Sequence, residues 1–334
     1  MSTDALTHAS ADDPQLTPDG RLRHLLSLAT LPRSLLEPLL ERAERYLTPP
    51  GERPARDSAL KGRTVANRFF EPSTRTRASF ELAAHRMSAD VLNLDVNMSS
   101  RTKGESVLAT ILTLQAMEVD VFVVRDASAG IPAFIARNVA PHVSVLNAGE
   151  ADVSHPTQAL LDLLTIRRRK PPLPELRVAI VGDIAHSRVA RSAAEVLHTF
   201  GVGELRLVGP PDLLPAEPLV PGALLVDDLA RGLRDADVVM ALRIQRERFR
   251  EMEGIPDPEQ YARQYGITRE RLGGAHPDAM VMHPGPMNRG VEIDGDVADG
   301  PQSAILEQVT NGVAVRMAVL ATVTETLIAS GSRR

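Results

Sequence analysis

Short apolar runs alternate with helical patterns along most of the chain. In the first half the apolar runs cover 63–70, 89–96, 119–125 and 143–147. Apolar residues recur at helical spacing in segments that end at Met87, run from about Glu105 to Met117, and lie near Ile131 to Val139. Strands separated by helices pair in parallel, because each helix carries the chain back along the sheet. The alternation therefore predicts an α/β fold with a parallel sheet.

The same alternation restarts in the second half. A helical pattern at 156–169 begins with Pro156 and ends in three arginines, as helices often do, and a Pro-rich linker follows. New apolar runs then cover 177–183, 204–209, 223–228, 236–242 and 279–285. With 334 residues the chain is long enough for about two domains, so we expect a second parallel sheet.

The patterns divide the chain into four predicted parts. Residues 1–20 are polar and aperiodic, which predicts a flexible N-terminal extension. The first domain comprises 21–153 together with 302–330, because the last helical pattern is expected to pack back against it. A helix at 154–170 joins it to a second domain at 171–301. The charged stretch from Arg243 to Arg271 predicts a partly irregular loop that covers a substrate.

The composition excludes several classes of protein. Since the chain has no Cys, it cannot form disulfides, a cysteine-ligated zinc site or a catalytic thiol. The first 20 residues hold four Asp and no Lys or Arg, the opposite of a signal peptide, so a cytoplasmic location is expected. No apolar run approaches the ~20 residues of a membrane span. A net charge of −5 and 3% aromatic residues indicate no nucleic-acid partner.

Five polar residues lie at the first strand-to-helix junction: Ser73, Thr74, Arg75, Thr76 and Arg77. The first turn of a helix has unpaired N–H groups and the positive end of the helix dipole, and it binds anions readily. Two guanidiniums and three hydroxyls would make this junction a phosphate site. The alternative is an ordinary N-cap with surface arginines.

Polar residues also follow the other strands of the first half. Ser99 and Lys103 lie in the loop 97–105, Arg125 ends the third run, and His155 and Gln158 belong to "HPTQ" after the fourth. Ligands gather at the carboxyl ends of parallel strands, so these residues would converge. The alternatives are a solvated lysine and a loop histidine.

In the second half, Arg188 and Arg243 each follow an apolar run. Two arginines at strand ends suit a dicarboxylate, because a guanidinium binds a carboxylate in bidentate fashion. Surface salt bridges are the alternative. "HPGP" at 283–286 contains a candidate cis bond, Gly285–Pro286. The stretch "IVGDIAHSR" lacks the dinucleotide-binding glycine spacing, and the sequence has neither a P-loop motif nor metal-spaced histidines.

Five motifs occur together in one order: "STRTR" at 73–77, "TKGE" at 102–105, "HPTQ" at 155–158, "RIQRER" at 243–248 and "HPGPMNRGVEI" at 283–293. In combination they resemble the aspartate/ornithine carbamoyltransferase family, and within it the aspartate enzymes, over nearly all of 21–330. The resemblance implies two parallel-sheet α/β domains joined by crossing helices. The first domain would bind carbamoyl phosphate and the second aspartate, with the active site between them.

The ornithine enzymes of the family are the alternative. They carry a Cys in an "HCLP" motif, whereas this chain has "HPGP" and no Cys. Arg243 and Gln245 also suit a carboxylate side chain better than an ammonium group, which Arg243 would repel. The Gly of "HPGPMNRG" replaces the Leu of some aspartate enzymes, which leaves the details of this turn open.

The resemblance assigns roles to individual residues. The phosphate of carbamoyl phosphate would be held by Ser73, Thr74, Arg75 and Thr76, and its carbonyl oxygen would face Thr76, Arg125 and His155. The carbamoyl amide would bind Gln158 and the backbone of Gly285 and Pro286. The carboxylates of aspartate would bind Lys103, Arg188, Arg243 and Gln245. Ser99 and Lys103 would come from an adjacent subunit, and Arg77, Glu105 and Arg316 would orient loops.

The implied reaction transfers the carbamoyl group to the amine of L-aspartate and gives N-carbamoyl-L-aspartate and phosphate, a step of pyrimidine biosynthesis. No metal or cofactor is expected, because carbamoyl phosphate is already activated and positioning supplies most of the rate. The implied assembly is a homotrimer, or a multiple of it, with shared active sites. The long start of the chain and "HPGPMNRG" resemble a bacterial branch that associates with a dihydroorotase-like partner. A non-catalytic family member is the competing class, but it would have lost some of these anion-binding residues.

Overall fold

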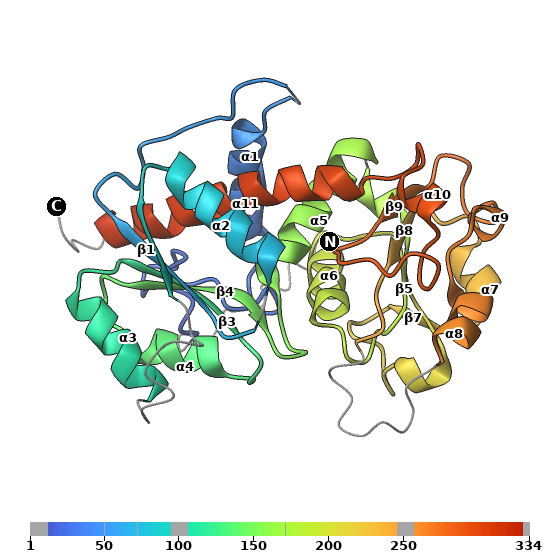
Figure 1. The fold of residues 1–334 in the computed structure, drawn as a ribbon, viewed down its shortest axis with the longest axis horizontal. Coiled ribbons are helices and arrows are strands. Elements are labelled where there is room, and N and C mark those ends of the chain that lie inside the picture. Colours follow the sequence, from blue (N-terminus) through green and yellow to red (C-terminus); the bar gives the residue numbers. More distant parts are fainter. Residues whose placement is uncertain are drawn as a thin grey trace, which may run out of the picture. The chain divides into compact units, whose positions relative to one another are not determined.

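The computed structural model of the protein describes residues 13–49, 51–71, 73–94, 106–170, 172–245 and 257–329 (Figure 1). The chain divides into two compact units, Met1–Thr157 with Gly312–Arg334, and Gln158–Asn311. Each unit contains its own sheet of parallel strands together with helices, which confirms the predicted α/β fold class. The finer boundaries, with 154–170 as a separate joining helix, stay a prediction.

The sheet of the first unit has the strand order β2-β1-β3-β4. Its strands are β1 (Thr64–Phe69), β2 (Asp90–Leu94), β3 (Val121–Asp126) and β4 (Ser144–Glu150), and all pairs are parallel. Every residue of β3 and β4 is buried, which is why these two runs are so apolar. The edge strand β2 is partly exposed. All four strands overlap the predicted runs, although β4 continues through Asn147 to Glu150.

The helices of the first unit are α1 (Arg33–Tyr46), α2 (Thr74–Arg86), α3 (Val107–Ala116), α4 (Ile131–Asn138) and the end of α11 (Ile305–Ala329). Helix α2 packs against β1 and β2, whereas α4 packs against β3 and β4. The sequence analysis did not predict α1. Its buried residues recur at helical spacing, but Pro38 lies inside the helix and a proline normally argues against one.

The sheet of the second unit has the strand order β7-β6-β5-β8-β9, again with parallel pairs only. Its strands are β5 (Arg177–Val181), β6 (Glu204–Val208), β7 (Leu224–Val226), β8 (Val238–Ala241) and β9 (Met280–Met282). Its helices are α6 (Arg188–Thr199), α7 (Leu229–Leu233), α8 (Pro258–Tyr265), α9 (Arg269–Leu272) and α10 (Gly295–Ala298). One apolar core joins the sheet to α7, α8 and α9. The stretch 243–271, predicted to be a partly irregular loop, contains α8 and most of α9. Its residues 246–256 lie outside the described part.

Helices α5 (Pro156–Arg169) and α11 meet within the second unit. Arg169 pairs with Glu307 at 2.6 Å, and Asn311 Nδ2 donates to Thr165 Oγ1 at 2.8 Å. By length and composition α11 could span a membrane, with a mean hydropathy of 1.5, contrary to the expectation that no apolar segment of this length is present. Since 78% of its apolar window is buried within the protein, its apolar character is that of a core helix.

Folded structure begins earlier than the sequence predicts. The extension was expected to reach residue 20, but Gln15 is buried and its Oε1 accepts hydrogen bonds from the backbone N–H groups of Leu26, at 2.7 Å, and Ser27, at 2.9 Å. A side-chain amide can thus replace a backbone partner, which periodicity cannot reveal. Residues 1–12 of the predicted extension lie outside the described residues.

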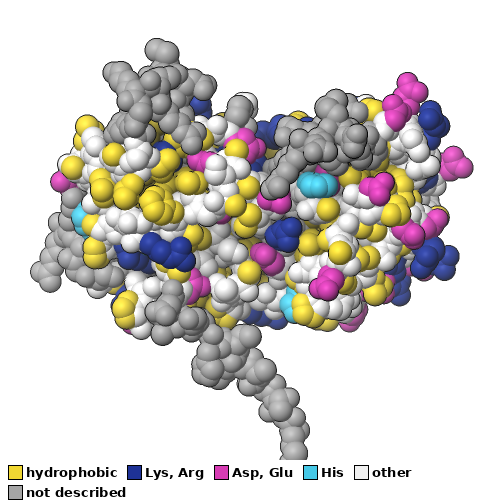
Figure 2. Space-filling model, turned by 90° about the horizontal axis from the view of Figure 1, so that it is seen from below, with side chains coloured by type: hydrophobic (Ala, Val, Ile, Leu, Met, Phe, Trp, Pro, Cys, Tyr) yellow, Lys and Arg dark blue, Asp and Glu magenta, His cyan; other side chains and the backbone are white. Residues whose placement is uncertain are grey.

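Acidic and basic side chains are interspersed on the face of the protein drawn in Figure 2. Among the described residues of that face, no extended patch of Lys and Arg is visible. The cationic groups that matter for function must therefore be sought individually, at the ends of the strands.

Gly182, directly after β5, lies close to the backbone that follows β8 and gives a test of the fold. It has φ 142°, and a Cβ there would lie 2.5 Å from the carbonyl oxygen of Leu242, which follows β8. We expect Gly182→Ala to lower the free energy of unfolding by about 2 kcal/mol or more, from backbone strain and the forced separation of β5 and β8. Urea denaturation measures the loss.

Gly201→Ala is the matched control for this variant. Gly201 also has a positive φ, of 70°, but no atom lies within 4 Å of the added Cβ. Its loss should be about 1 kcal/mol, the conformational cost alone. Equal losses of unfolding free energy in the two variants would show that the close contact with Leu242 adds no cost to a side chain at residue 182.

Candidate active site

Both sheets reverse their direction of strand addition beside their first strand. In the first unit β1 has β2 on one side and β3 on the other, and in the second unit β5 lies between β6 and β8. Ligands of open α/β sheets bind at such reversals, beyond the carboxyl ends of the strands. We call residues 73–77, which follow β1, and Arg125, at the end of β3, the first half-site. Those after β5 and β8, 183–188 and 243–245, form the second half-site.

The N-terminus of α2 carries the first half-site. Ser73 occupies the N-cap position with an extended backbone, but its side chain makes no capping hydrogen bond. By contrast, Ser106 caps α3 and Ser187 caps α6 through their hydroxyls. The ordinary N-cap that the sequence offered as an alternative is therefore absent at Ser73, and the first-turn amides of α2 keep their capacity to bind an anion. Thr74 and Arg75 are exposed, while Thr76 is buried.

Arg125, at the end of β3, is held by groups of its own unit. Its Nη2 donates to Glu71 Oε1 at 2.6 Å, and its Nη1 donates to the carbonyl oxygen of Ala148 at 3.2 Å. The sequence analysis missed Glu71, although an acidic residue two positions before "STRTR" was a visible signal. The pair fixes the direction of a buried guanidinium beside the junction.

The "HPTQ" residues fall in both units. His155 is buried in the first unit, directly before α5. Gln158 is buried in the second unit, where its Nε2 donates to Asp162 Oδ1 at 3.0 Å. Asp162 lies one turn further along α5 and was not among the predicted site residues.

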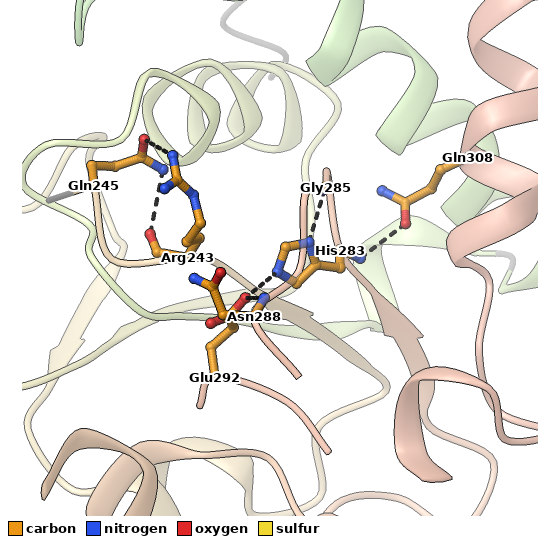
Figure 3. A network of polar contacts seen from close by, with 7 residues as sticks. All are labelled: Arg243, Gln245, His283, Gly285, Asn288, Glu292 and Gln308. Atoms are coloured by element: carbon orange, nitrogen blue, oxygen red, sulfur yellow. Dashed lines mark hydrogen bonds and ion pairs between the residues drawn. The ribbon is translucent and has the colours of Figure 1, made fainter. Parts of the chain in front are cut away.

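Asp183 organises the second half-site. Its carboxylate is buried; Oδ1 contacts the ring of His186 at 2.8 Å, and Oδ2 accepts from the backbone N–H of Gln245 at 3.0 Å. It thereby ties the loop after β5, which leads to the buried Arg188, to the segment after β8. There Arg243 Nη2 donates to Gln245 Oε1 at 3.4 Å (Figure 3). The structure thus brings the predicted aspartate-binding residues of this unit to one edge of the sheet. Asp183 itself was missed, because an acid after a strand is common.

The "HPGP" turn is held by the ring of His283 (Figure 3). His283 Nδ1 accepts from the backbone N–H of Gly285 at 2.8 Å, so this nitrogen carries no proton. The proton is on Nε2, which lies 3.2 Å from Glu292 Oε1, and the same oxygen accepts from the N–H of Asn288 at 2.6 Å. Gly285–Pro286 is cis, in agreement with its selection as a candidate cis bond.

The Tyr261 phenol lies among the acids of this unit. Burial, followed by the carboxylates of Glu292 and Asp183, raises the pKa of Tyr261. Its ring stacks on Tyr265 at a centroid distance of 5.7 Å.

The remaining predicted residues divide into described and undescribed ones. Arg77 is exposed on α2, and the Arg316 guanidinium lies over the Phe80 ring at 5.0 Å. Ser99, Lys103 and Glu105 lie outside the described residues. Within the described ranges, no three His, Asp or Glu side chains gather in a way that could hold a metal ion.

The chain matches two family models in sequence order. Residues 23–168 match the carbamoyl-P binding domain of aspartate/ornithine carbamoyltransferase, and residues 174–323 match its Asp/Orn binding domain. The two matches cover most of the chain, and their division follows that of the two sheets. The protein belongs to the aspartate/ornithine carbamoyltransferase family.

Solved structures of both branches are similar to the chain. Aspartate transcarbamoylase from Trypanosoma cruzi in complex with carbamoyl phosphate and aspartate is 31% identical, with 90% of this chain and 96% of that chain covered and a TM-score of 0.80. The structure of the same enzyme with aspartate and phosphate is 29% identical, with 90% of this chain and 96% of that chain covered and a TM-score of 0.80. Ornithine carbamoyltransferase from Thermus thermophilus is 27% identical, with 90% of this chain and 98% of that chain covered and a TM-score of 0.77. Family and fold therefore establish a carbamoyltransferase, and the second substrate has to be argued from individual residues.

The His283 ring gives a test of the turn. His283→Leu removes the acceptor of the Gly285 N–H and the donor to Glu292, so the free energy of unfolding should fall by about 2 to 4 kcal/mol. His283→Asn keeps an acceptor where Nδ1 lies, so it should lose about half as much. Chemical denaturation of both variants measures the difference. Equal losses of unfolding free energy would show that the hydrogen bond from the Gly285 N–H to the ring does not stabilise the turn.

Proposed function

We propose that the protein is an aspartate carbamoyltransferase, which converts carbamoyl phosphate and L-aspartate into N-carbamoyl-L-aspartate and phosphate. The product is a precursor of pyrimidines, which gives the reaction its proposed metabolic role. The observation that carries the proposal is the second half-site, where Arg188 and Arg243 follow the neighbouring strands β5 and β8.

Charge favours aspartate over ornithine at this half-site. Two guanidiniums suit the two carboxylates of aspartate, whereas the ammonium of an ornithine side chain would be repelled by Arg243. Asp183 is close by, but its oxygens already bind His186 and the Gln245 backbone. It therefore serves as a support for the half-site and leaves the guanidiniums as its charged groups.

The first half-site suits the phosphate of the other substrate. The proposed ligands are the amides and hydroxyls of Ser73, Thr74 and Thr76 together with Arg75, and the uncapped start of α2 supports them. In the reaction the amine nitrogen of aspartate attacks the carbamoyl carbon, the bond from this carbon to the phosphate oxygen breaks, and the leaving phosphate takes the amine proton.

Charge develops on the carbonyl oxygen during this attack. Thr76, Arg125 and His155 are the proposed donors to it, and each preorganised donor is worth about 3 to 4 kcal/mol in the transition state. Glu71 supports this role by holding Arg125 in one direction. Gln158 and the turn 283–286 are the proposed ligands of the carbamoyl amide.

Substrate preference tests the proposal directly. Purified wild-type protein should carbamoylate aspartate much faster than ornithine, with phosphate release as the measurement. Arg243→Ala should raise the KM for aspartate at least about tenfold, as expected for a lost charge-assisted hydrogen bond, and leave the KM for carbamoyl phosphate nearly unchanged. Arg269→Ala removes an exposed arginine of the same unit, paired with Asp296, and should change neither constant. Faster turnover of ornithine would overturn the proposal.

The proposal includes a homotrimer, or a multiple of it, in which Ser99 and Lys103 act in the site of a neighbouring subunit. A lysine in a polar loop needs external support to be preorganised, and a closed cyclic assembly supplies it at every site. A dihydroorotase-like partner chain is a further proposed component, on the sequence resemblance alone.

Subunit mixing tests the shared site. Arg75→Ala and Lys103→Ala chains should each keep less than about a tenth of the activity, since each lacks a charge-assisted contact in every site. When they are mixed in equal amounts, dissociated and reassociated, roughly a quarter of the interfaces pair two intact groups, and activity should return to about that fraction. Inactive hybrids of verified composition would show that Lys103 acts within its own subunit.

A further inference from the structure

Two parts of the proposed carbamoyl-amide pocket converge on one carboxylate oxygen. Asp162 Oδ1 accepts from Gln158 Nε2 at 3.0 Å and from Gln308 Nε2 at 2.7 Å. Gln308 in turn accepts, through Oε1, the backbone N–H of His283 at 2.9 Å. Asp162 on α5 is therefore linked directly to Gln158 and, through Gln308 on α11, to the "HPGP" turn. Figure 3 shows the last of these links, from Gln308 to His283.

These residues are removed from solvent. The exposed fractions are 1% for Asp162, 2% for Gln308, 2% for His283 and 8% for Gln158. Buried polar groups keep the orientation in which their hydrogen bonds are satisfied, because an unmade bond costs the full desolvation of the group. The hydrogen bonds to Asp162 Oδ1 therefore favour this orientation of the two glutamine amides.

The direction of each amide follows from the chemistry of a carboxylate. An ionised carboxylate only accepts, so both glutamine side chains must present their nitrogens to Asp162. Gln158 Oε1 then faces away from Asp162 as an acceptor, and Gln308 Oε1 is directed to the His283 N–H. A carbamoyl NH2 group is a donor, and an acceptor at Gln158 is what it requires.

We propose that Asp162 is a positioning residue that orients Gln158 and the turn 283–286 together, and so makes the site select a substrate whose carbonyl carries an NH2 group. This inference rests on the proposed binding of carbamoyl phosphate. Asp162 does not touch the substrate; it sets the direction of the groups that do. It should matter for the carbamoyl end of the ligand and not for its phosphate.

A purely structural role is the competing explanation, and the same two helices provide its control. One turn further from the turn 283–286, Asn311 Nδ2 donates to Thr165 Oγ1 at 2.8 Å, which is another buried bond between α5 and α11. Thr165→Ala removes this bond without touching Gln158 or Gln308. It reports the effect of loosening the two helices alone.

The variants are measured by their affinities for three probes: carbamoyl phosphate, acetyl phosphate, in which a methyl group replaces the NH2, and inorganic phosphate. Asp162→Ala should lower the affinity for carbamoyl phosphate at least about tenfold and leave the affinities for acetyl phosphate and inorganic phosphate within about twofold of wild type. Asp162→Asn keeps an Oδ1 acceptor and should restore most of the affinity. Thr165→Ala should bind all three probes like wild type.

Gln308→Met keeps the inference testable if Asp162→Ala does not fold. It removes the link to the His283 N–H at nearly constant volume, so it should also weaken carbamoyl phosphate selectively. The inference would be overturned if the variant lost affinity equally for all three probes, or if Thr165→Ala lost as much affinity for carbamoyl phosphate. Both branches of the family use carbamoyl phosphate as a substrate. A preference for ornithine would therefore contradict the proposed function, but the affinities measured here would still test the role of Asp162.

Discussion

Parallel strands bring polar groups from distant parts of a chain together only where the strand order reverses, and both sheets of this protein depend on that constraint. The reversal beside β1 gathers the junction 73–77 and Arg125, and the reversal beside β5 gathers Arg188 with Arg243. Elsewhere along the sheets, neighbouring loops leave on the same side and cover the strand ends. The repeated topology thus creates two separate cationic positions from one architectural rule.

Acids, all but Glu71 of them buried, fix the direction of the donors at these positions. Glu71 holds Arg125, Asp183 holds the backbone of Gln245, Glu292 holds the His283 ring, and Asp162 holds two glutamines. An ionised carboxylate cannot donate, so each acid leaves its partner only one orientation. Groups that are already oriented need not reorganise when charge develops on a substrate, which is the main source of electrostatic catalysis.

The sequence predicted the strands and roughly half of the helices, because buried parallel strands and long amphipathic helices leave strong periodic patterns. It missed α1, in which Pro38 contradicts the pattern, and the short helices α7 to α10. It also missed the ordered start of the chain, where Gln15 acts as a substitute for backbone. The cationic residues at strand ends could be selected, since parallel topology implies where they lie. Their acidic partners could not, because an isolated Asp resembles a surface charge until its partner is known. Asp162 and Gln308, 146 residues apart, show how little local sequence reveals of such a pair.

The single oxygen shared by Gln158 and Gln308 also constrains how this sequence can change over generations. Replacing the acid at 162 removes the reason for an amide at both other positions, whereas replacing one glutamine leaves the acid and the second glutamine still matched. Drift would therefore pass through residue 308 or 158 before it reached 162, and position 162 would be the last of the three to vary.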